Sequence, residues 1–559
     1  MASPTASLEP SSAGRAPTAD KPAQSVELDN EYEDAEKNYQ PKSLKFWTIM
    51  IGMYLSIFLV ALDRTIIATA IPKITDEFNS IEDIGWYGSA YMLAAACLFP
   101  ISGRIYQLYS TKWIFIISLI IFEAGSALCG AAPNSVAFII GRAIAGLGSA
   151  CIFTGGMMII LPLIPLRKRP IYTSFFGMAF GIASVLGPIM GGTFTDKVTW
   201  RWCFYINLPI GGFAILATLL FLHTPSPKHG KLTVIAHIKN LDPIGTIFFV
   251  PSMVCLILAL QWGGSTYSWS APKIIGLLVA FAILLVIFVV VEVLMPETAI
   301  TLTWVVLNRS VAGSMIFMFL LSGGLMSIIY YLSIWFQVIK GDSAIHSGIS
   351  TIPLILSMVV LSIPTAIFTQ KTGYYVPALL LSPVLCATAA GLLSTLAPSS
   401  GHSKWIGYQV LYGFGIGCGF QTCNLVPQNV LPRADVPLGV AVMFFMQQLG
   451  GSIFISVSQN IFSNKLVSSL SGIAGLDTEA IVNTGATNLR SIVPASQLST
   501  VVDAYNYSLT RVFMMTAALS SCMIMGSLAV EWKSIKGEKG SEGSPKSEEA
   551  KLEEDKSEV

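Results

Sequence analysis

Residues 46–69 read FWTIMIGMYLSIFLVALDRTIIAT, a stretch in which Asp63 and Arg64 are the only charged side chains. A helix needs about 20 consecutive, mostly apolar residues to cross the hydrocarbon core of a bilayer. Lipid offers no hydrogen bonds, so a segment that crosses it must satisfy its backbone groups internally, as a helix does. This stretch therefore predicts a transmembrane helix that holds two charges inside the membrane.

Apolar runs of similar length recur along the rest of the chain. Hydrophobic residues make up 53% of the 559 residues and charged residues 12%, whereas an ordinary soluble chain has about 25% charged residues. The mean hydropathy is +0.66. Lipid is therefore the expected solvent for most of the chain. The predicted spans are 46–69, 84–108, 113–132, 136–160, 171–192, 203–223, 242–262, 272–294, 312–337, 345–369, 375–396, 405–425, 437–463 and 510–531.

These spans predict an all-α integral membrane protein with two six-helix bundles plus two additional central helices, 14 transmembrane helices in all. Repeated bundles that face a central site are a common build of secondary transporters. The expected segments are a disordered cytoplasmic N-terminal tail at 1–44, an N-terminal six-helix bundle at 45–223, a linker with two extra transmembrane helices at 224–298, a C-terminal six-helix bundle at 299–531 and a disordered cytoplasmic C-terminal tail at 532–559.

Composition and spacing argue against several other kinds of protein. The net charge of +1 gives no indication of nucleic acid binding. The nine cysteines form no CxxC pair, and the five histidines show no metal-ligand spacing. The sequence has neither a nucleophile elbow nor a phosphate-binding loop. We therefore expect that the protein is not an enzyme and that it has no catalytic residue, no metal site and no cofactor.

The distribution of lysine and arginine predicts the orientation. An even number of spans places both tails on one side, and positive charge marks the cytoplasmic side. The Arg-Lys-Arg run at 167–169 and the three lysines between 228 and 239 lie on the tail side. Both termini are therefore expected in the cytoplasm. The longest external loop would be 464–509; its glycosylation sequon at Asn506 lies so close to the last span that we do not expect its use.

Charges inside a membrane are costly, so each is a candidate functional residue. Asp63 lies about six residues before the outer end of its span, and Arg142 about six residues after the outer start of its own. At 1.5 Å rise per residue, the two side chains lie at similar depth and could pair, while Glu123 lies nearer the midplane. A carboxylate in such a setting is suited to proton coupling, and the three residues are our candidates for it. The alternative is a static ion pair that only fixes helix packing, with Glu123 bonded to a neighbouring helix.

Two further charges, Arg104 and Glu292, lie near the inner ends of their spans. Side chains at such positions more often reach the membrane surface or the rim of a gate than a central site.

The fifth span is rich in glycine. Gly181, Gly187, Gly191 and Gly192 lie along this one span. Pro188, which lies among them, removes one backbone hydrogen bond of the helix. Small residues let two helices approach closely, and a kinked helix with such a face could rock against its neighbour. Two alternatives remain open: close packing without motion, or a helix that simply ends at Gly191-Gly192.

Several segments, taken together, resemble the major facilitator superfamily, specifically the fourteen-span drug:proton antiporters of fungi. The segments are LDRTII at 62–67, GRAIAGLG at 141–148, GPIMGG at 187–192, WRWCFYINLP at 200–209, LDPIG at 241–245 and QWGG at 261–264. The resemblance covers about 45–531. It implies the major facilitator fold, links Arg142 to proton transfer, and identifies 187–192 as an antiporter motif associated with export.

One segment departs from that pattern. The predicted cytoplasmic gate loop runs from Gly103 and Arg104 to Lys112, and Gln107 stands where the superfamily pattern has an aspartate. In the family that aspartate helps to form a charge network at the cytoplasmic gate. The substitution leaves open whether the gate here works in the usual way.

The resemblance implies export of a toxin, drug or secondary metabolite in exchange for protons, with the proton gradient as the energy source. The expected partners are the small-molecule substrate and the lipid bilayer, without nucleic acid or an obligate protein partner, so that a monomer is expected. The expected location is the plasma membrane, with a vacuolar or vesicular membrane as the alternative. A proton-coupled uptake symporter for a siderophore, amino acid or sugar would use the same fold, and a receptor or membrane enzyme is the third alternative.

Overall fold

The computed structural model describes residues 35–536, except 37, 81–82, 223–238, 265–266, 296–302, 472–492 and 495–496. Most of both predicted tails, part of the predicted linker and most of the predicted loop at 464–509 lie outside the described residues. Within the described ranges the protein is helical, and its β-structure is one isolated bridge between Gly263 and Tyr267.

Twelve of the described helices are long and apolar enough to cross a membrane. Two further helices, α3 (Ile84–Leu108) and α17 (His402–Cys423), have 25 and 22 residues and coincide with predicted spans. Hydropathy does not place these two among the candidate spans. The all-α membrane fold is thus confirmed, whereas the count of fourteen transmembrane helices stays a prediction.

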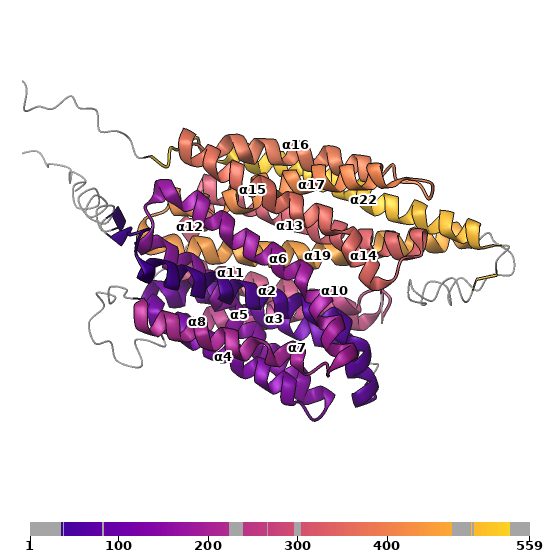
Figure 1. Ribbon diagram of the computed structural model, residues 1–559, viewed down its shortest axis with the longest axis horizontal. Coiled ribbons are helices and arrows are strands. Elements are labelled where there is room, and N and C mark those ends of the chain that lie inside the picture. The colour runs from indigo at the N-terminus through magenta and orange to yellow at the C-terminus, as the bar shows by residue number, and fades with distance from the viewer. Residues whose placement is uncertain are drawn as a thin grey trace, which may run out of the picture.

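The first group of helices packs around α5 (Figure 1). Helices α3 and α4 lie against α5, and α2 lies against α6 and α8. The bounds are α2 (Leu44–Phe78), α3 (Ile84–Leu108), α4 (Thr111–Ala131), α5 (Ser135–Leu163), the 3-10 helix η2 (Leu166–Lys168), α6 (Arg169–Lys197), α7 (Trp202–Tyr205) and α8 (Asn207–Phe221).

The second group packs around α13 and α17, the former against α19 and α22 and the latter against α15 and α16. The bounds are α12 (Thr303–Leu307), α13 (Arg309–Trp335), the π-helical turn η3 (Phe336–Lys340), α14 (Ala344–Ser350), α15 (Ile352–Thr372), α16 (Val376–Leu393), α17 (His402–Cys423), α18 (Val426–Val430), the 3-10 helix η4 (Arg433–Asp435), α19 (Val436–Leu470) and α22 (Leu498–Ala529).

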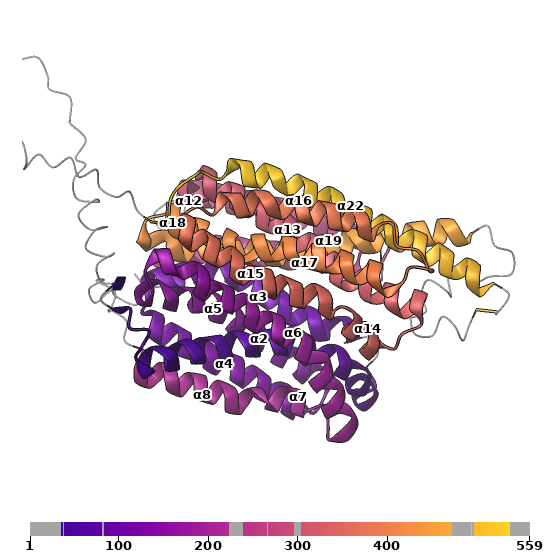
Figure 2. The ribbon, with the colours of Figure 1, turned by 45° about the horizontal axis from the view of Figure 1, so that its top comes forward.

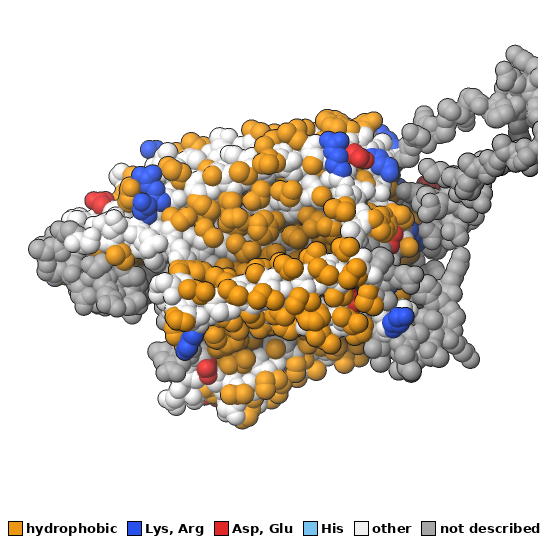
Figure 3. All heavy atoms as spheres, turned by 180° about the vertical axis from the view of Figure 1, so that it is seen from behind, with side chains coloured by type: hydrophobic (Ala, Val, Ile, Leu, Met, Phe, Trp, Pro, Cys, Tyr) orange, Lys and Arg blue, Asp and Glu red, His pale blue; other side chains and the backbone are white. Residues whose placement is uncertain are grey.

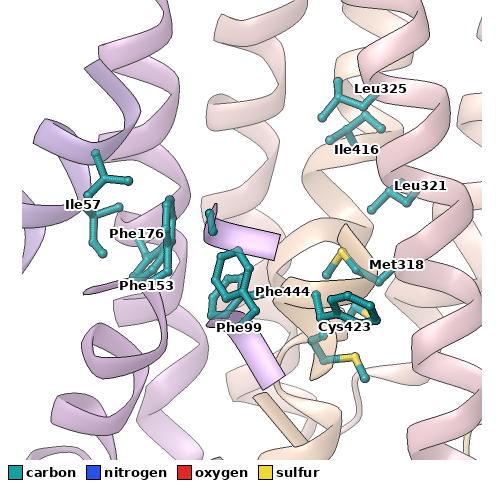
Figure 4. Close-up of a cluster of buried hydrophobic side chains, with 14 of the residues drawn as sticks. Ile57, Phe99, Phe153, Phe176, Met318, Leu321, Leu325, Ile416, Cys423 and Phe444 are labelled. Carbon is teal, nitrogen blue, oxygen red and sulfur yellow. The ribbon is translucent and has the colours of Figure 1, made fainter. Parts of the chain in front are cut away.

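The two groups meet chiefly through two helix pairs, α3 with α19 and α6 with α15. Between them, aromatic rings from both sides stack in one buried cluster (Figure 4). Phe444 of α19 lies 5.8 Å from Phe99, 5.5 Å from Phe153 and 6.2 Å from Phe176, measured between ring centroids. Apolar packing therefore joins the two groups at this level.

The additional pair, α10 (Pro243–Trp262) and α11 (Pro272–Leu294), pack on each other, and α10 rests on α3 and α19. At one end Gln261 donates to the carbonyl of Gly85 (2.9 Å), and Ser456 of α19 donates to that of Leu260 (3.1 Å). Only 11% of the apolar stretch of α11 is buried within the protein. The pair thus lies at the periphery of the junction between the groups, with α11 facing outward.

Helices α19 and α22 extend into the loop predicted at 464–509. α19 has 35 residues and α22 has 32, or about 50 Å each at 1.5 Å per residue, against about 30 Å of hydrocarbon. Their joined ends project past the other helices (Figure 2). The prediction that 464–509 is a loop was therefore wrong at both ends, because polar residues ended the apolar runs but not the helices.

This extension changes the setting of the sequon. Asn506 lies within α22, where Trp335 donates to its side-chain oxygen (2.8 Å) and its amide donates to the carbonyl of Leu396 (3.0 Å). Both ends of the amide are thus used in helix contacts rather than presented on a loop.

The outer surface matches a bilayer. Hydrophobic side chains cover the middle of the molecule, and lysine and arginine gather toward its two ends (Figure 3). Helix α2 begins and α22 ends at the same end of the bundle (Figure 2). Residues at the borders of the predicted tails also pack there: the Tyr39 hydroxyl lies 3.1 Å from that of Tyr172, and the backbone of Ile535 donates to Gly373 (2.9 Å).

Candidate functional site

Asp63 of α2 and Arg142 of α5 form an ion pair in the interior of the first helix group. Arg142 Nη1 lies 2.5 Å from Asp63 Oδ2, and the two side chains are 1% and 0% exposed. The Nε of Arg142 donates to the backbone carbonyl of Tyr87 (2.9 Å). The pairing predicted from depth is thereby confirmed, and the guanidinium is held from two sides.

Small residues bring the helices around Arg142 close together. A Cβ on Gly146 would overlap the backbone of Tyr91 in α3, and one on Gly141 would lie 2.7 Å from the sulfur of Cys129 in α4. The glycines of the segment 141–148 therefore let α3 and α4 approach α5 on both sides, which encloses the arginine between them.

Asn207, at the start of α8, is a third member of the site that the sequence analysis did not single out. Its amide nitrogen lies 3.4 Å from Asp63 Oδ1 and donates to the hydroxyl of Ser126 in α4 (3.1 Å). Asn207 is fully buried. It falls within the quoted segment 200–209, but its contacts depend on how α8 faces α2 and α4, which the sequence does not give.

Glu123 lies on the same helix as Ser126, one turn earlier, and is 8% exposed. Neither carboxyl oxygen has a hydrogen-bond partner among the described residues. The carboxyl group packs against Gly211 of α8, where any Cβ would overlap it. Glu123 therefore borders the Asp63–Arg142 pair through Ser126 and Asn207 but belongs to no ion pair in the described part of the chain.

The glycines of α6 face two different neighbours. A Cβ on Gly181 would lie 2.7 Å from Val359 of α15, in the second helix group. Gly187 and Gly191 instead face α2, where Cβ atoms would overlap Thr65 and approach the carbonyl of Ile66 (2.5 Å). One face of α6 thus meets the other group, and the other face meets the turn that carries Asp63.

The course of α6 settles one alternative. The helix continues through Pro188, Gly191 and Gly192 to Lys197, so the Gly191-Gly192 pair is not a helix end. The glycines lie in the helix interior, and the hydroxyl of Thr65 donates to the Ala183 carbonyl between them (3.3 Å).

The predicted cytoplasmic gate is joined to α19 through Gln107. Its amide accepts from Arg104 Nη1 (2.7 Å) and donates to Asp435 Oδ1 (2.9 Å), at the entry to α19. A Cβ on Gly103 would lie 2.9 Å from the backbone of Leu438. The carboxylate of this contact thus comes from the second helix group, and Gln107 reaches it from the first.

Two other residues of that region make backbone contacts. Lys112 donates to the carbonyl of Leu219 in α8 (2.7 Å), within the first helix group. Arg104 also donates from Nε to the carbonyl of Asn240 (2.9 Å), which ties the gate to the chain that enters α10. Glu292, which is 5% exposed, lies near Arg104 at the same end.

A mostly apolar pocket lies between α6 and helices α13, α15 and α17. Its walls include Phe180 from the first helix group and Met326, Met358 and Phe420 from the second. Gln421 is a polar group in the lining. The cavity therefore lies where the two groups meet, bordered by the glycine-rich face of α6.

Two helical groups with a cavity between them, and a buried ion pair inside the first group, are typical of secondary membrane transporters. The comparison with known families agrees. The model of the Major Facilitator Superfamily matches residues 53–455, and the chain belongs to that superfamily. It is a multi-pass integral membrane protein.

Several relatives are similar over nearly their whole length. "MFS-type efflux pump MFS1" of Trichophyton rubrum is 49% identical over 509 residues, 91% of this chain and 95% of the relative. "Efflux pump aflT" of Aspergillus parasiticus is 45% identical, over 90% and 99% of the two chains. "Efflux pump roqT" of Penicillium rubens is 46% identical, over 88% and 92%.

Among solved structures, the human organic anion transporter MFSD10 (TETRAN) matches with a TM-score of 0.55 at 14% identity. The match covers 85% of this chain and 99% of that one. At this identity the likeness is one of fold.

Proposed function

We propose that the protein is a secondary active exporter of small organic molecules such as toxins, drugs or secondary metabolites, and that it moves them in exchange for protons by alternating access. The buried Asp63–Arg142 pair is the single observation that carries this proposal. The similar proteins named efflux pumps support the direction of transport.

In this mechanism Asp63, with Glu123, takes up and releases the proton. Arg142 modulates this step, because it is the ion-pair partner of Asp63 at 2.5 Å. Separation of α2 from α5 during the transport cycle would break the pair. Since α6 packs against α2 beside Asp63 and against α15 across the junction, its movement can link the charge pair to the opening between the groups.

The remaining parts of the proposal follow from the same mechanism. The energy source is the proton gradient rather than a bound cofactor or an enzymatic reaction. The partners are the small-molecule substrate and the lipid bilayer, and the working unit is a monomer. We place the protein in the plasma membrane, with a vacuolar or vesicular membrane as the alternative.

The test is efflux from yeast cells stripped of their own pumps. The cells express the full chain, are loaded with a panel of fluorescent amphipathic compounds, and are followed with and without a protonophore. Expression-dependent efflux that collapses with the protonophore is the expected result. Increased accumulation would contradict export and favour an uptake symporter, and efflux that ignores the protonophore would contradict proton exchange.

A further inference from the structure

Arg64 is a second guanidinium beside the ion pair, and no carboxylate of the described residues pairs with it. It follows Asp63 in α2, but the Asp63 carboxylate is engaged by Arg142. Arg64 forms no ion pair or hydrogen bond with any residue that the structure describes, and its Nε and Nη2 are buried without a partner. Because two of its charged nitrogens are buried, the side chain is not simply extended into water at the membrane surface.

The two unpartnered nitrogens have a specific geometry. In arginine, Nε and Nη2 present their N–H groups on the same side of the planar guanidinium. This is the fork that binds both oxygens of a carboxylate with two parallel hydrogen bonds. The two unused N–H donors of Arg64 are therefore the pair that binds a carboxylate.

Aromatic rings hold Arg64 in place without using these N–H groups. Its guanidinium carbon lies 5.4 Å from the centre of the Tyr91 ring and 5.7 Å from that of Phe153. Arg142 lies 4.5 Å from the same Tyr91 ring. Cation–π contacts fix the position of a cation but leave its in-plane donors available, so packing alone does not account for the two unused nitrogens.

The same aromatic cluster leads from Arg64 to the cavity. Phe153 contacts Phe180, with 6.4 Å between the ring centroids, and Phe180 is part of the cavity wall. The described lining contains no charged side chain. A cation thus lies two rings from an apolar space, an arrangement that suits a molecule with one anionic end and one hydrophobic body.

We propose that Arg64 binds the carboxylate of an amphipathic organic anion whose apolar body occupies the cavity between α6 and α15. This deepens the proposed function and rests on it: the exported molecules include organic carboxylates, and Arg64 selects them. The other substrates of such a cavity, neutral or cationic, would gain nothing from Arg64.

The experiment compares two probes that differ in charge and in one methyl group, 1-pyrenebutyrate and its methyl ester. The purified full-length protein is placed in lipid nanodiscs without a proton gradient. Binding is followed by energy transfer from tryptophan to pyrene, and the signal of empty nanodiscs is subtracted. We expect the wild-type protein to bind the carboxylate at least about tenfold more tightly than the ester, because the fork supplies two charge-assisted hydrogen bonds.

The Arg64→Gln variant should lose this preference by binding the carboxylate about tenfold more weakly while leaving ester binding unchanged. Arg64→Lys keeps the charge without the fork, and an intermediate preference is expected. Arg511→Gln is the matched control, because Arg511 of α22 also has a buried, unpartnered Nε but stacks on Tyr507 of its own helix. This variant should keep the full preference.

Three results would overturn the proposal: equal binding of both probes by the wild-type protein, no binding of either, or an equal loss for both probes in Arg64→Gln, which would mean a structural role. If Arg64→Gln does not fold, Arg64→Lys and the wild-type preference decide the matter. These outcomes are separable from those of the efflux test, because binding is measured without a gradient. Efflux that is insensitive to the protonophore would contradict proton exchange, but it would not contradict the selection of carboxylates by Arg64.

Discussion

Asp63 and Arg142 neutralise each other inside the membrane, so a substitution at either position acts through the partner left behind. Breaking a buried ion pair by removing one charge costs about 3–5 kcal/mol, because the other charge remains buried without compensation. A loss of transport in a single variant therefore mixes a loss of stability with a loss of mechanism, and the two must be separated.

The double variant Asp63→Asn with Arg142→Gln makes that separation. We expect Asp63→Asn alone to lose proton-coupled export and part of its thermal stability, and the double variant to regain most of the stability but none of the coupled export. Thermal unfolding of the purified proteins and protonophore-sensitive efflux are the measurements. If the double variant exports like the wild type, the pair is a packing element and Asp63 has no part in coupling.

A second ion pair, outside the membrane-spanning part of α2, gives a prediction of pH dependence. Trp200 Nε1 donates to Glu77 (2.6 Å) and Arg201 Nη2 lies 2.7 Å from it. These contacts, the tryptophan first, lower the pKa of Glu77 from its ordinary value. A carboxyl group with a lowered folded-state pKa contributes stability above its ordinary pKa and loses that contribution as the pH falls through the folded-state value.

Glu77→Gln should therefore reduce stability at pH 7 and have a smaller effect at pH 3. Glu77 is 47% exposed, so the difference should stay under about 1 kcal/mol. Thermal unfolding at both pH values measures it. Asp76→Asn is the control, since Asp76 is an exposed neighbour without an ion pair to a described residue. Equal effects of Glu77→Gln at the two pH values would refute the assignment.

At the residue scale, the depth of a side chain in the membrane could be predicted from the sequence, whereas the direction in which it points around its helix could not. Asp63 and Arg142 could be placed at one depth, because each helix rises by a fixed amount per residue. Asn207 and the partner of Gln107 could not be predicted, because such contacts depend on how helices turn toward one another. The contact of Lys112 with α8 could not be predicted for the same reason.

At the element scale, the close packing of α6 against α2 gives the next prediction. Gly191→Ala would place a Cβ 2.5 Å from the carbonyl oxygen of Ile66, a backbone atom that cannot rotate away. The helices would have to separate, with an expected cost of about 1–3 kcal/mol and reduced transport. The matched control is Gly276→Ala in α11, where a Cβ would meet nothing within 4 Å. Thermal unfolding and efflux are compared for both.

If Gly191→Ala is as stable and active as Gly276→Ala, the α2–α6 contact has no role in either packing or transport.

The existence of α6 and its glycines could be read from the sequence, and so could most helices. The ends of α19 and α22 could not, because beyond the membrane a helix continues on polar residues and packing between helices replaces hydropathy as the cause.

At the scale of the whole molecule, the contact between Gln107 and Asp435 joins the two helix groups at the cytoplasmic side of the proposed orientation. A hydrogen bond to a charged group contributes about 1.5–3 kcal/mol. Gln107→Ala should therefore increase the population of molecules open at this side by about tenfold or more.

Spin labels at Arg167→Cys and Lys371→Cys can measure this change, because both residues are exposed and lie at that end of different helix groups. Exposed Cys522 is first replaced by serine. The distance distribution between the labels should shift to longer values in Gln107→Ala and stay unchanged in Lys112→Ala, whose amine bonds within the first group. An unchanged distribution in Gln107→Ala would mean that other contacts hold this side closed.

The position of the α10–α11 pair makes the two flanks of the molecule unequal to the lipids around it. On one flank α10 rests on the junction of α3 and α19, so annular lipids there touch the additional pair. On the other flank, apolar side chains of the α6–α15 junction, such as Ile182, Leu356 and Val360, are themselves exposed. Changes in bilayer thickness or acyl-chain order therefore act on the moving helices chiefly from the α6–α15 side, which also borders the cavity.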